Sequence, residues 1–391
     1  MQLVAQGAQD AYLTGKPEIT FFKIVYRRHT AFAVESISQT LNGTVGFGNT
    51  VSSVISRNGD LVNNLLMEIT YETENDVHND TRMGFQLVKE CEIEIGGQRI
   101  DRQYSDWMKI WTDLTHTSEK KNMLSKMVDG VADSSGSSPQ TFYVPLQFWF
   151  CRDNGLALPL IALQYHEVKL KVTFEDRNMA AVIQGHVGAG NNPAHESGNN
   201  TLVDNTASIS ATLYADYVYL DTDERKKFAQ AEHEYLIEQV QRSKESITNR
   251  GDNKFRLNFN HPVKELVWVS VSDKGDDFGY YQANVEEAKL VLNGHERMSM
   301  RAGEYFNYVQ PYQHHTGCPS EGCYVYSFAL NPEKHQPSGT CNFSRIDNAT
   351  LELHLDDDTS AGSDYNTMHI FAHNYNVLRI MSGMGGLAYS N

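Results

Sequence analysis

Two histidines and two cysteines lie close enough in the chain to suggest a soft-metal site. His314 and His315 are adjacent, and Cys318 and Cys323 follow shortly after them. Imidazole and thiolate groups are the ligands that zinc and copper prefer. No pair of these residues has zinc-finger spacing, so we predict a polar surface loop here and keep a metal site as the alternative.

Other residues with chemical potential do not form recognisable catalytic patterns. Three consecutive aspartates, residues 356–358, could bind calcium, but EF-hand spacing is missing, which favours a solvated acidic turn. The glycine-rich run at residues 185–190 lacks the flanking strand and helix of a phosphate-binding loop. The sequence motifs of serine hydrolases, zinc proteases and P-loop enzymes are absent. We therefore predict a protein that is not an enzyme and that uses no cofactor or metal.

The cysteines indicate a reducing environment. Their number is odd and their spacing wide, at Cys91, Cys151, Cys318, Cys323 and Cys341. This pattern predicts reduced, mostly buried thiols in a cytosolic setting. A disulfide between Cys318 and Cys323, closed across the turn at residues 319–322, is the alternative.

Charge and hydropathy exclude further classes of function. The formal net charge of −16 repels a phosphate backbone, and the densest basic cluster, Lys23–Arg28, holds only three cations. We therefore predict no direct contact with nucleic acid. The N-terminus lacks the features of a signal peptide, and no run approaches the ~18 apolar residues of a membrane span. We expect neither secretion by the standard route nor a transmembrane segment.

The second half of the chain repeats the first. Three pairs of similar segments occur in the same order, namely Cys91–Ile100 with Lys289–Met298, Tyr165–Phe174 with Asn348–Leu355, and Ala211–Thr222 with Met368–Ile380. Each segment alternates apolar and polar residues as a half-buried strand does. Two copies of an all-β unit make a pseudo-symmetric block, which indicates assembly rather than catalysis.

Many short strands and a few helices are predicted. Strand patterns at residues 32–41, 45–56, 61–72 and 86–95 are separated by Asn-Gly and Gly-Gly turns, as in a sandwich or jelly roll.

Residues 105–114 form a helix in this prediction, with one apolar face made by Trp107, Ile110, Trp111 and Leu114. We interpret that face as a lid over the sandwich core, in preference to a ligand platform. A second short helix begins at Ser118.

The domain organisation follows from these patterns. We predict a base segment at residues 1–25, a first jelly roll at 26–220, a connector with a short helix at 221–250, and a second jelly roll at 251–391. Charge density and helical spacing indicate a short helix or an ordered connector from about Asp221 to Gln241. Residues 178–205 are predicted to form a long exposed loop, and the small residues after Met381 to lie extended against the body.

Six long segments carry a resemblance to a known family. They are QLVAQGAQDAYLTGKPEITFFKIVYRRHT from residue 2, VGFGNTVSSVISRNGDL from 45, EIGGQRIDRQYSDW from 94, GLALPLIALQYHEVKL from 155, QPSGTCNFSRIDNATL from 336 and NYNVLRIMSGMGGLAY from 374. Together they span the chain in order. The sequence resembles the major capsid proteins of nucleocytoplasmic large DNA viruses, most closely the chlorella-virus-like members that infect algae.

The resemblance implies an all-β double jelly roll, with two eight-stranded sandwiches and short helices in the loops. It implies a structural subunit of an icosahedral double-stranded DNA virus capsid, in which a homotrimer forms a pseudo-hexagonal capsomer. Its partners would be neighbouring capsomers, minor capsid and penton proteins, and a nearby internal viral membrane. Its location would be the virion, after assembly in the host cytoplasm. The loop at residues 273–284 is short for this family, so the loop at 178–205 would be the main surface ornament.

Individual residues acquire roles by the same resemblance. The base segment would bring Arg27 and Arg28 to acidic partners or lipid headgroups, and ion pairs within the chain are the alternative. Members of the family can be glycosylated, and Asn79 and Asn199 are the candidate positions among the Asn-X-Ser/Thr sequences because they lie in polar loops.

Two other functions remain open at this level. A minor double-jelly-roll capsid paralogue would have the same sequence pattern. A carbohydrate-binding or fibre protein can also use jelly rolls, although repeated aromatic and acidic loops are not found in the two halves.

Overall fold

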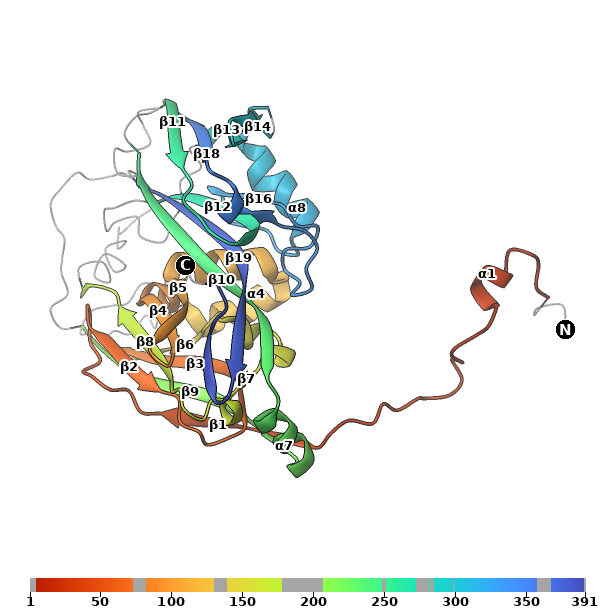
Figure 1. Ribbon diagram of the computed structural model, residues 1–391. Coiled ribbons are helices and arrows are strands. Elements are labelled where there is room, and N and C mark those ends of the chain that lie inside the picture. The colour runs from red at the N-terminus through yellow and green to blue at the C-terminus, as the bar shows by residue number, and fades with distance from the viewer. Residues whose placement is uncertain are drawn as a thin grey trace.

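The computed structural model describes residues 5–72, 82–129, 139–177, 207–247, 251–271, 281, 285–297, 299–356 and 367–389. The described elements form two β-sandwiches, one built from each half of the chain, with an extended N-terminal arm that leaves the body (Figure 1).

The first sandwich contains two antiparallel sheets. One has the order β1 (Phe32–Gln39), β9 (Ser208–Leu220), β3 (Leu61–Glu72) and β6 (Gln140–Pro145), with the short β7 (Leu158–Pro159) beside β3. The other has the order β2 (Thr50–Val54), β8 (Val168–Phe174), β4 (Val88–Ile95) and β5 (Gln98–Tyr104). Alternate residues of these strands are buried in one core, as the apolar period of two requires.

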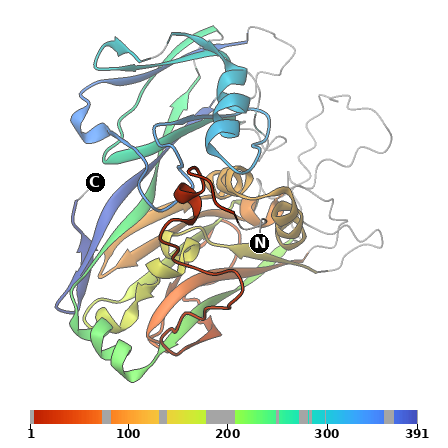
Figure 2. The same ribbon diagram turned by 90° about the vertical axis from the view of Figure 1, so that its right-hand side faces the viewer.

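The second sandwich repeats this arrangement. One sheet has the order β10 (His233–Ser246), β19 (Thr367–Met381), β12 (Pro262–Val271) and β16 (Cys323–Ser327), joined by β17 (Cys341–Asn342) and β20 (Met384–Leu387). The other has the order β11 (Gly251–Arg256), β18 (Ala349–Leu355), β13 (Val285–Leu292) and β14 (His295–Glu296), with β15 (Arg301–Ala302) beside β13. Figure 2 shows the two sandwiches one above the other.

The strand orders confirm the internal repeat. The segments paired by sequence are equivalent strands, since β4, β8 and β9 take the same places in the first half as β13, β18 and β19 in the second. The likeness extends to a local irregularity. The ladder of β3 with β9 shifts register between Val62 and Asn64, and that of β12 with β19 shifts between Val263 and Glu265. The fold is therefore a double jelly roll, as predicted.

Short helices occupy the connections. They are α1 (Ala11–Thr14), α2 (Met83–Gln86), α3 (Ser105–Thr115), α4 (Ser118–Val128), α5 (Trp149–Arg152), η2 (Asn154–Leu156), η3 (Leu160–Ala162), α7 (Thr222–Gln230), η5 (Tyr305–Val309), α8 (Gln310–His314) and η6 (Phe343–Arg345). None of the helices in the described part of the chain is long and apolar enough to cross a membrane.

The connector differs from the prediction. Helix α7 is capped by the side chain of Asp221, which accepts hydrogen bonds from the backbone of Asp223 and Glu224, but the helix ends at Gln230. The connector is therefore shorter than the predicted stretch from Asp221 to Gln241, because residues 233–246 form β10 and pair along their whole length with β19. Tertiary strand pairing outweighs the local helical spacing of charges.

The C-terminal residues lie extended, as predicted. Strand β20 folds back on β19, and a side chain added at Gly385 would collide with Leu163 and Ile95 of the first roll. The carbonyl oxygen of Gly385 also lies 2.9 Å from the Nδ1 atom of His166. The end of the second half is thus fastened to the first.

Candidate functional site

The apolar face of α3 lies between the two rolls. It packs on the outer face of the sheet β10-β19-β12-β16, in a buried cluster made of Tyr104, Trp107, Ile110, Trp111, Leu114, Val240, Val267, Val269, Val271, Cys323, Val325 and Phe371. The rings of Trp107 and Trp111 stack with centroids 5.8 Å apart. The prediction of a lid over the sandwich core is wrong, because this face covers the outer side of the sheet that contains β12 and β19, two strands whose residues are buried on both faces. We call this contact the seam.

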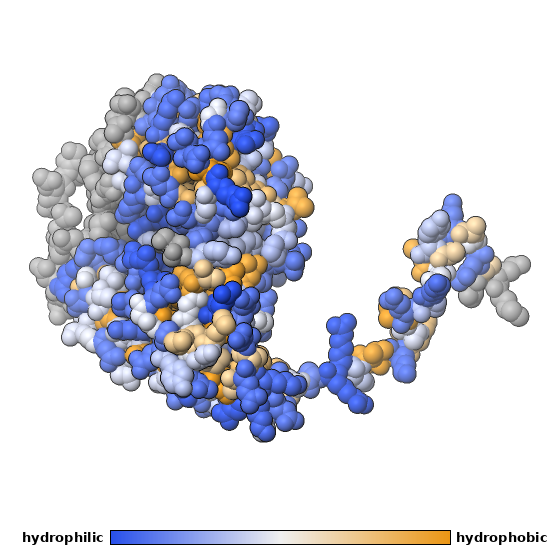
Figure 3. Space-filling view, in the orientation of Figure 1, coloured by the Kyte–Doolittle hydropathy of each residue, from blue (hydrophilic) through white to orange (hydrophobic). Residues whose placement is uncertain are grey.

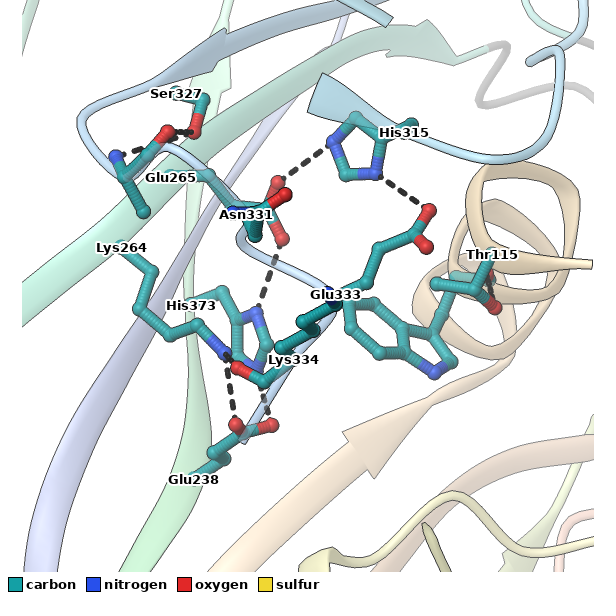
Figure 4. A network of polar contacts seen from close by, with 12 residues as sticks. Thr115, Glu238, Lys264, Glu265, His315, Ser327, Asn331, Glu333, Lys334 and His373 are labelled. Atoms are coloured by element: carbon teal, nitrogen blue, oxygen red, sulfur yellow. Dashed lines mark hydrogen bonds and ion pairs between the residues drawn. The ribbon is translucent and has the colours of Figure 1, made fainter. Parts of the chain in front are cut away.

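A network of buried charges crosses the seam (Figure 4). The carboxylate of Glu265, on β12, lies 3.0 Å from Nδ1 of His373, on β19, and 2.9 Å from Nε2 of His315. The other ring nitrogen of His315 lies 3.2 Å from Glu333. The side chains of Glu265, His315 and His373 are fully buried, so these charges are shielded from water.

A second carboxylate extends the network to the first roll. Glu238, on β10, lies 2.7 Å from the Nζ atom of Lys264 and 3.2 Å from Nε2 of His373. Arg152, from α5 of the first roll, donates a hydrogen bond of 2.9 Å to Glu238. The Arg152 guanidinium also lies over the ring of Trp111, 4.0 Å from its centroid. The two rolls are therefore joined by a charge pair as well as by apolar contact.

The network is charged near neutral pH. Burial alone would raise the pKa of Glu265, but the attraction and hydrogen bonds of His315 and His373 outweigh it and hold the pKa below its ordinary value. Burial alone would lower the pKa of His315, but Glu265 and Glu333 raise it to about 9. Every charge named in this group has a partner of opposite sign, as in a structural network of ion pairs.

The raised pKa of His315 predicts a loss of stability in alkali. Protonation of His315 stabilises the fold fully below its unfolded pKa of about 6.5, and this contribution is lost as pH rises through about 9. We expect the midpoint of urea unfolding to fall more between pH 7 and pH 10 for the wild-type chain than for the variant His315→Gln. Parallel pH profiles of the two proteins would contradict this assignment.

The predicted metal-site residues have separate environments. His314 bonds to the carbonyl of Leu330 at 3.1 Å, whereas His315 is buried in the seam network, so the prediction of a surface loop is wrong for His315. Cys318 is exposed and Cys323 buried, and both are free thiols. Within the described residues no group of His, Cys, Asp and Glu side chains is arranged to hold a metal ion.

Arg27 and Arg28 lie on the extended N-terminal arm, residues 5–31, away from the body (Figure 1). Neither forms an ion pair with any part of the chain that the structure describes, so the alternative of ion pairs within the chain finds no support there. The arm also exposes large apolar side chains, which are Tyr12, Leu13, Ile19, Phe21, Phe22, Ile24, Val25 and Tyr26 (Figure 3). Apolar and basic groups together on an exposed segment indicate an interaction surface.

The candidate glycosylation positions Asn79 and Asn199 lie outside the described residues, as do Asp357 and Asp358 of the acidic turn and the glycine-rich run at 185–190.

Sequence reasoning missed the seam network. Glu265 follows Lys264 inside the apolar run of β12, and two adjacent charges in a strand that is otherwise apolar were the available signal. Such a pair is tolerated only where each charge finds a buried partner. The partners Glu238 and His373 lie on other strands, at sequence distances that no local pattern reveals.

Comparison with known proteins agrees with the fold. Residues 20–221 match the family model of the major capsid protein N-terminus, and residues 224–386 match that of the large eukaryotic DNA virus major capsid protein. The major capsid protein of Pyramimonas orientalis virus is 50% identical, and that of Paramecium bursaria Chlorella virus 1 is 43% identical; both matches cover 100% of this chain and 99% of the relative.

Solved structures show the same architecture. The chain is similar to PBCV-1 VP54, with a TM-score of 0.83 and 40% identity over 95% of this chain and 100% of that one. The Faustovirus major capsid protein shares the fold at 13% identity, with a TM-score of 0.72 over 96% of this chain and 94% of that one. From its two family matches, its relatives along the whole length and its two equivalent rolls, we conclude that this chain belongs to the major capsid proteins of large eukaryotic DNA viruses.

Proposed function

We propose that the chain is a non-enzymatic shell subunit that forms a homotrimeric, pseudo-hexagonal capsomer and tiles an icosahedral capsid with its neighbours. The observation that supports this most strongly is an asymmetry between equivalent surfaces of the two rolls. One roll has its outer sheet face covered inside the chain, and the other does not.

In the second roll the outer sheet face is buried. Strands β12 and β19 are buried on both faces, because α3, from the connection between β5 and β6 of the first roll, covers the outer one. This contact is the seam described above.

In the first roll the equivalent face is open along most of its length. On β3 buried residues alternate with half-buried ones, and on β6 they alternate mainly with exposed ones, so only the inner face is packed. Val34 of β1 points to the outer side, opposite Val218, and is 53% exposed. Asn64 and Asp216, which take the places of Glu265 and His373, bond to each other at 2.9 Å on this half-buried face. An unpartnered sheet face of this kind fits a subunit contact.

The second roll carries a counterpart of α3 that could cover this face. Segments η5 and α8 occupy the connection between β14 and β16, as α3 does between β5 and β6. They expose Tyr308, Val309 and Tyr312, and Tyr312 is 89% exposed. We propose that this side of one copy packs on the β1-β9-β3-β6 face of the next. The contact is heterologous, because two different surfaces meet. When each roll packs on the next as the two rolls of one chain do at the seam, the ring closes at three chains.

The native mass tests this proposal. Light scattering coupled to size exclusion is expected to give a species near three times 44.1 kDa. We expect Val34→Asp and Tyr312→Asp each to weaken the trimer by at least about tenfold in dissociation constant, since both bury a charge in the contact. Met384→Asp is the matched control, because Met384 is an exposed apolar residue outside both faces. A wild-type monomer, or trimers unaffected by both variants, would refute the proposed contact.

We propose further properties by resemblance to the family. The N-terminal segment would lie at the capsomer base, toward minor capsid and penton proteins and the internal viral membrane, and assembly would take place in the host cytoplasm. Asn79 and Asn199 stay the proposed glycosylation positions. For the division of the chain, we assign residues 32–220, which begin with β1, to the first roll and, because β10 belongs to the second sheet system, residues 233–389 to the second.

A further inference from the structure

An acidic groove with an apolar floor lies beside α7. It has a volume of about 520 Å³, and its lining includes Leu61, Ala157, Leu220, Phe228, Glu224 and Glu232. The Oε2 atom of Glu224 is buried and has no hydrogen-bond partner among the described residues. Glu232 is exposed and makes no ion pair within the same described ranges. The groove therefore offers two carboxylates, one half-buried and one exposed, to a cationic or donor group.

The N-terminal arm has the complementary chemistry. Residues 19–28 combine apolar side chains with the cations Lys23, Arg27 and Arg28, and Phe22 is 98% exposed. Guanidinium groups are suited to carboxylates because they donate hydrogen bonds in a planar fork. The aromatic and aliphatic side chains of the arm suit the apolar floor of the groove.

The place of the groove points to a second copy as the source of the arm. Phe32, where the arm joins β1, pairs with Leu220 in the groove wall, and the arm runs away from the body (Figure 1). No described residue of the arm is among those that line the groove. Leu220 also lies on the outer side of the β1-β9-β3-β6 sheet, so the groove borders the face proposed to contact another copy. Because Arg28 lies four residues before Phe32, its Cα atom can be at most roughly 14 Å from that of Phe32, so the groove must belong to a copy whose α7 comes this close to the start of β1.

We infer that residues 19–28 of one copy bind in the α7 groove of a second copy, with Arg27 and Arg28 facing Glu224 and Glu232. This inference rests on the proposed capsomer, which holds a second copy within reach. When an arm and a groove are complementary but do not bind each other within one molecule, the arm can bind the groove of a second molecule.

A photo-crosslinker tests the contact in the full-length protein. p-Benzoylphenylalanine at Phe22, followed by irradiation, is expected to give covalent multiples of 44.1 kDa on denaturing gels, with adducts at residues 224–235 of a second chain by mass spectrometry. Arg27→Glu with Arg28→Glu is expected to lower the yield about tenfold, and so is Glu224→Lys with Glu232→Lys. All four substitutions together restore the charge pairing and are expected to restore the yield.

Arg256→Glu with Arg345→Glu is the matched control, because it makes the same change in net charge at exposed positions of the second roll. Adducts confined to the monomer band would show that the arm folds onto its own chain and would overturn the inference. Adducts outside the groove, or none in a sample whose native mass is trimeric, would overturn it and leave the capsomer standing. A monomeric native mass would count against both.

Discussion

Replacing Trp107 with alanine is expected to lower the free energy of unfolding by about 3–5 kcal/mol. Trp107 is fully buried in the seam, where its ring lies 5.5 Å from Phe371 of the second roll and stacks on Trp111 of its own helix. The substitution removes the ring from both contacts and leaves a cavity between the rolls. Because the seam joins the two sandwiches, the loss is also expected to uncouple them, so that calorimetry resolves two transitions in place of one.

Met123→Ala provides the control for this prediction. Met123 is 63% exposed on the neighbouring helix α4, and its truncation is expected to change the free energy of unfolding by no more than about 0.5 kcal/mol. A Trp107→Ala protein that unfolds in one transition with the wild-type midpoint would show that the seam does not couple the rolls.

The substitution Glu265→Leu is expected to cost about 3–5 kcal/mol of unfolding free energy. Glu265 is the shared partner of His315 and His373, and all three side chains are fully buried. Without Glu265, the protonated His315 has only Glu333 as a partner. One ring nitrogen of His373 also loses its carboxylate partner, while the other keeps Glu238. The penalty comes mainly from the buried positive charge that loses its partner. Chemical unfolding of the purified protein at pH 7 measures it.

Two companion variants separate this cause from a simple packing defect. Glu265→Leu combined with His315→Leu removes the unpaired charge and is expected to recover at least half of the loss. Glu234→Leu breaks an exposed ion pair with Arg379, of 2.7 Å, and is expected to cost less than about 1 kcal/mol. If the double variant were as unstable as Glu265→Leu, the loss would have to be assigned to shape rather than charge.

Much of the fold could be predicted from the chain alone, because its strands are bounded by local signals. The expected strand at residues 61–72 coincides with β3, and the hairpin of β4 and β5 turns at the predicted Gly96-Gly97, where both residues have positive φ. The three repeated segment pairs identified equivalent strands correctly, since equivalent places in a sheet demand the same alternation of buried and exposed residues.

The seam could not be predicted, because it depends on which surfaces meet after each roll has formed. The apolar face of α3 was visible in the sequence, but an amphipathic helix does not specify which sheet it covers. Burial on both faces turns β12 into a nearly continuous apolar run, so its outer residues cannot be told from its inner ones by pattern. The predicted connector ran on to Gln241 for the same reason, since only pairing with β19 defines β10.

The place of β19 in the chain has a consequence for biosynthesis. It is a central strand of its sheet and pairs with β10 and β12, yet it begins at residue 367, more than a hundred residues after β10 ends. A nascent chain can complete the first roll once β9 has emerged. The Trp face of α3 and the edges of β10 and β12 that pair with β19 stay uncovered until translation is nearly over. Newly made subunits therefore pass through a stage in which an apolar helix face and open sheet edges are exposed together, the state in which protection from aggregation matters most.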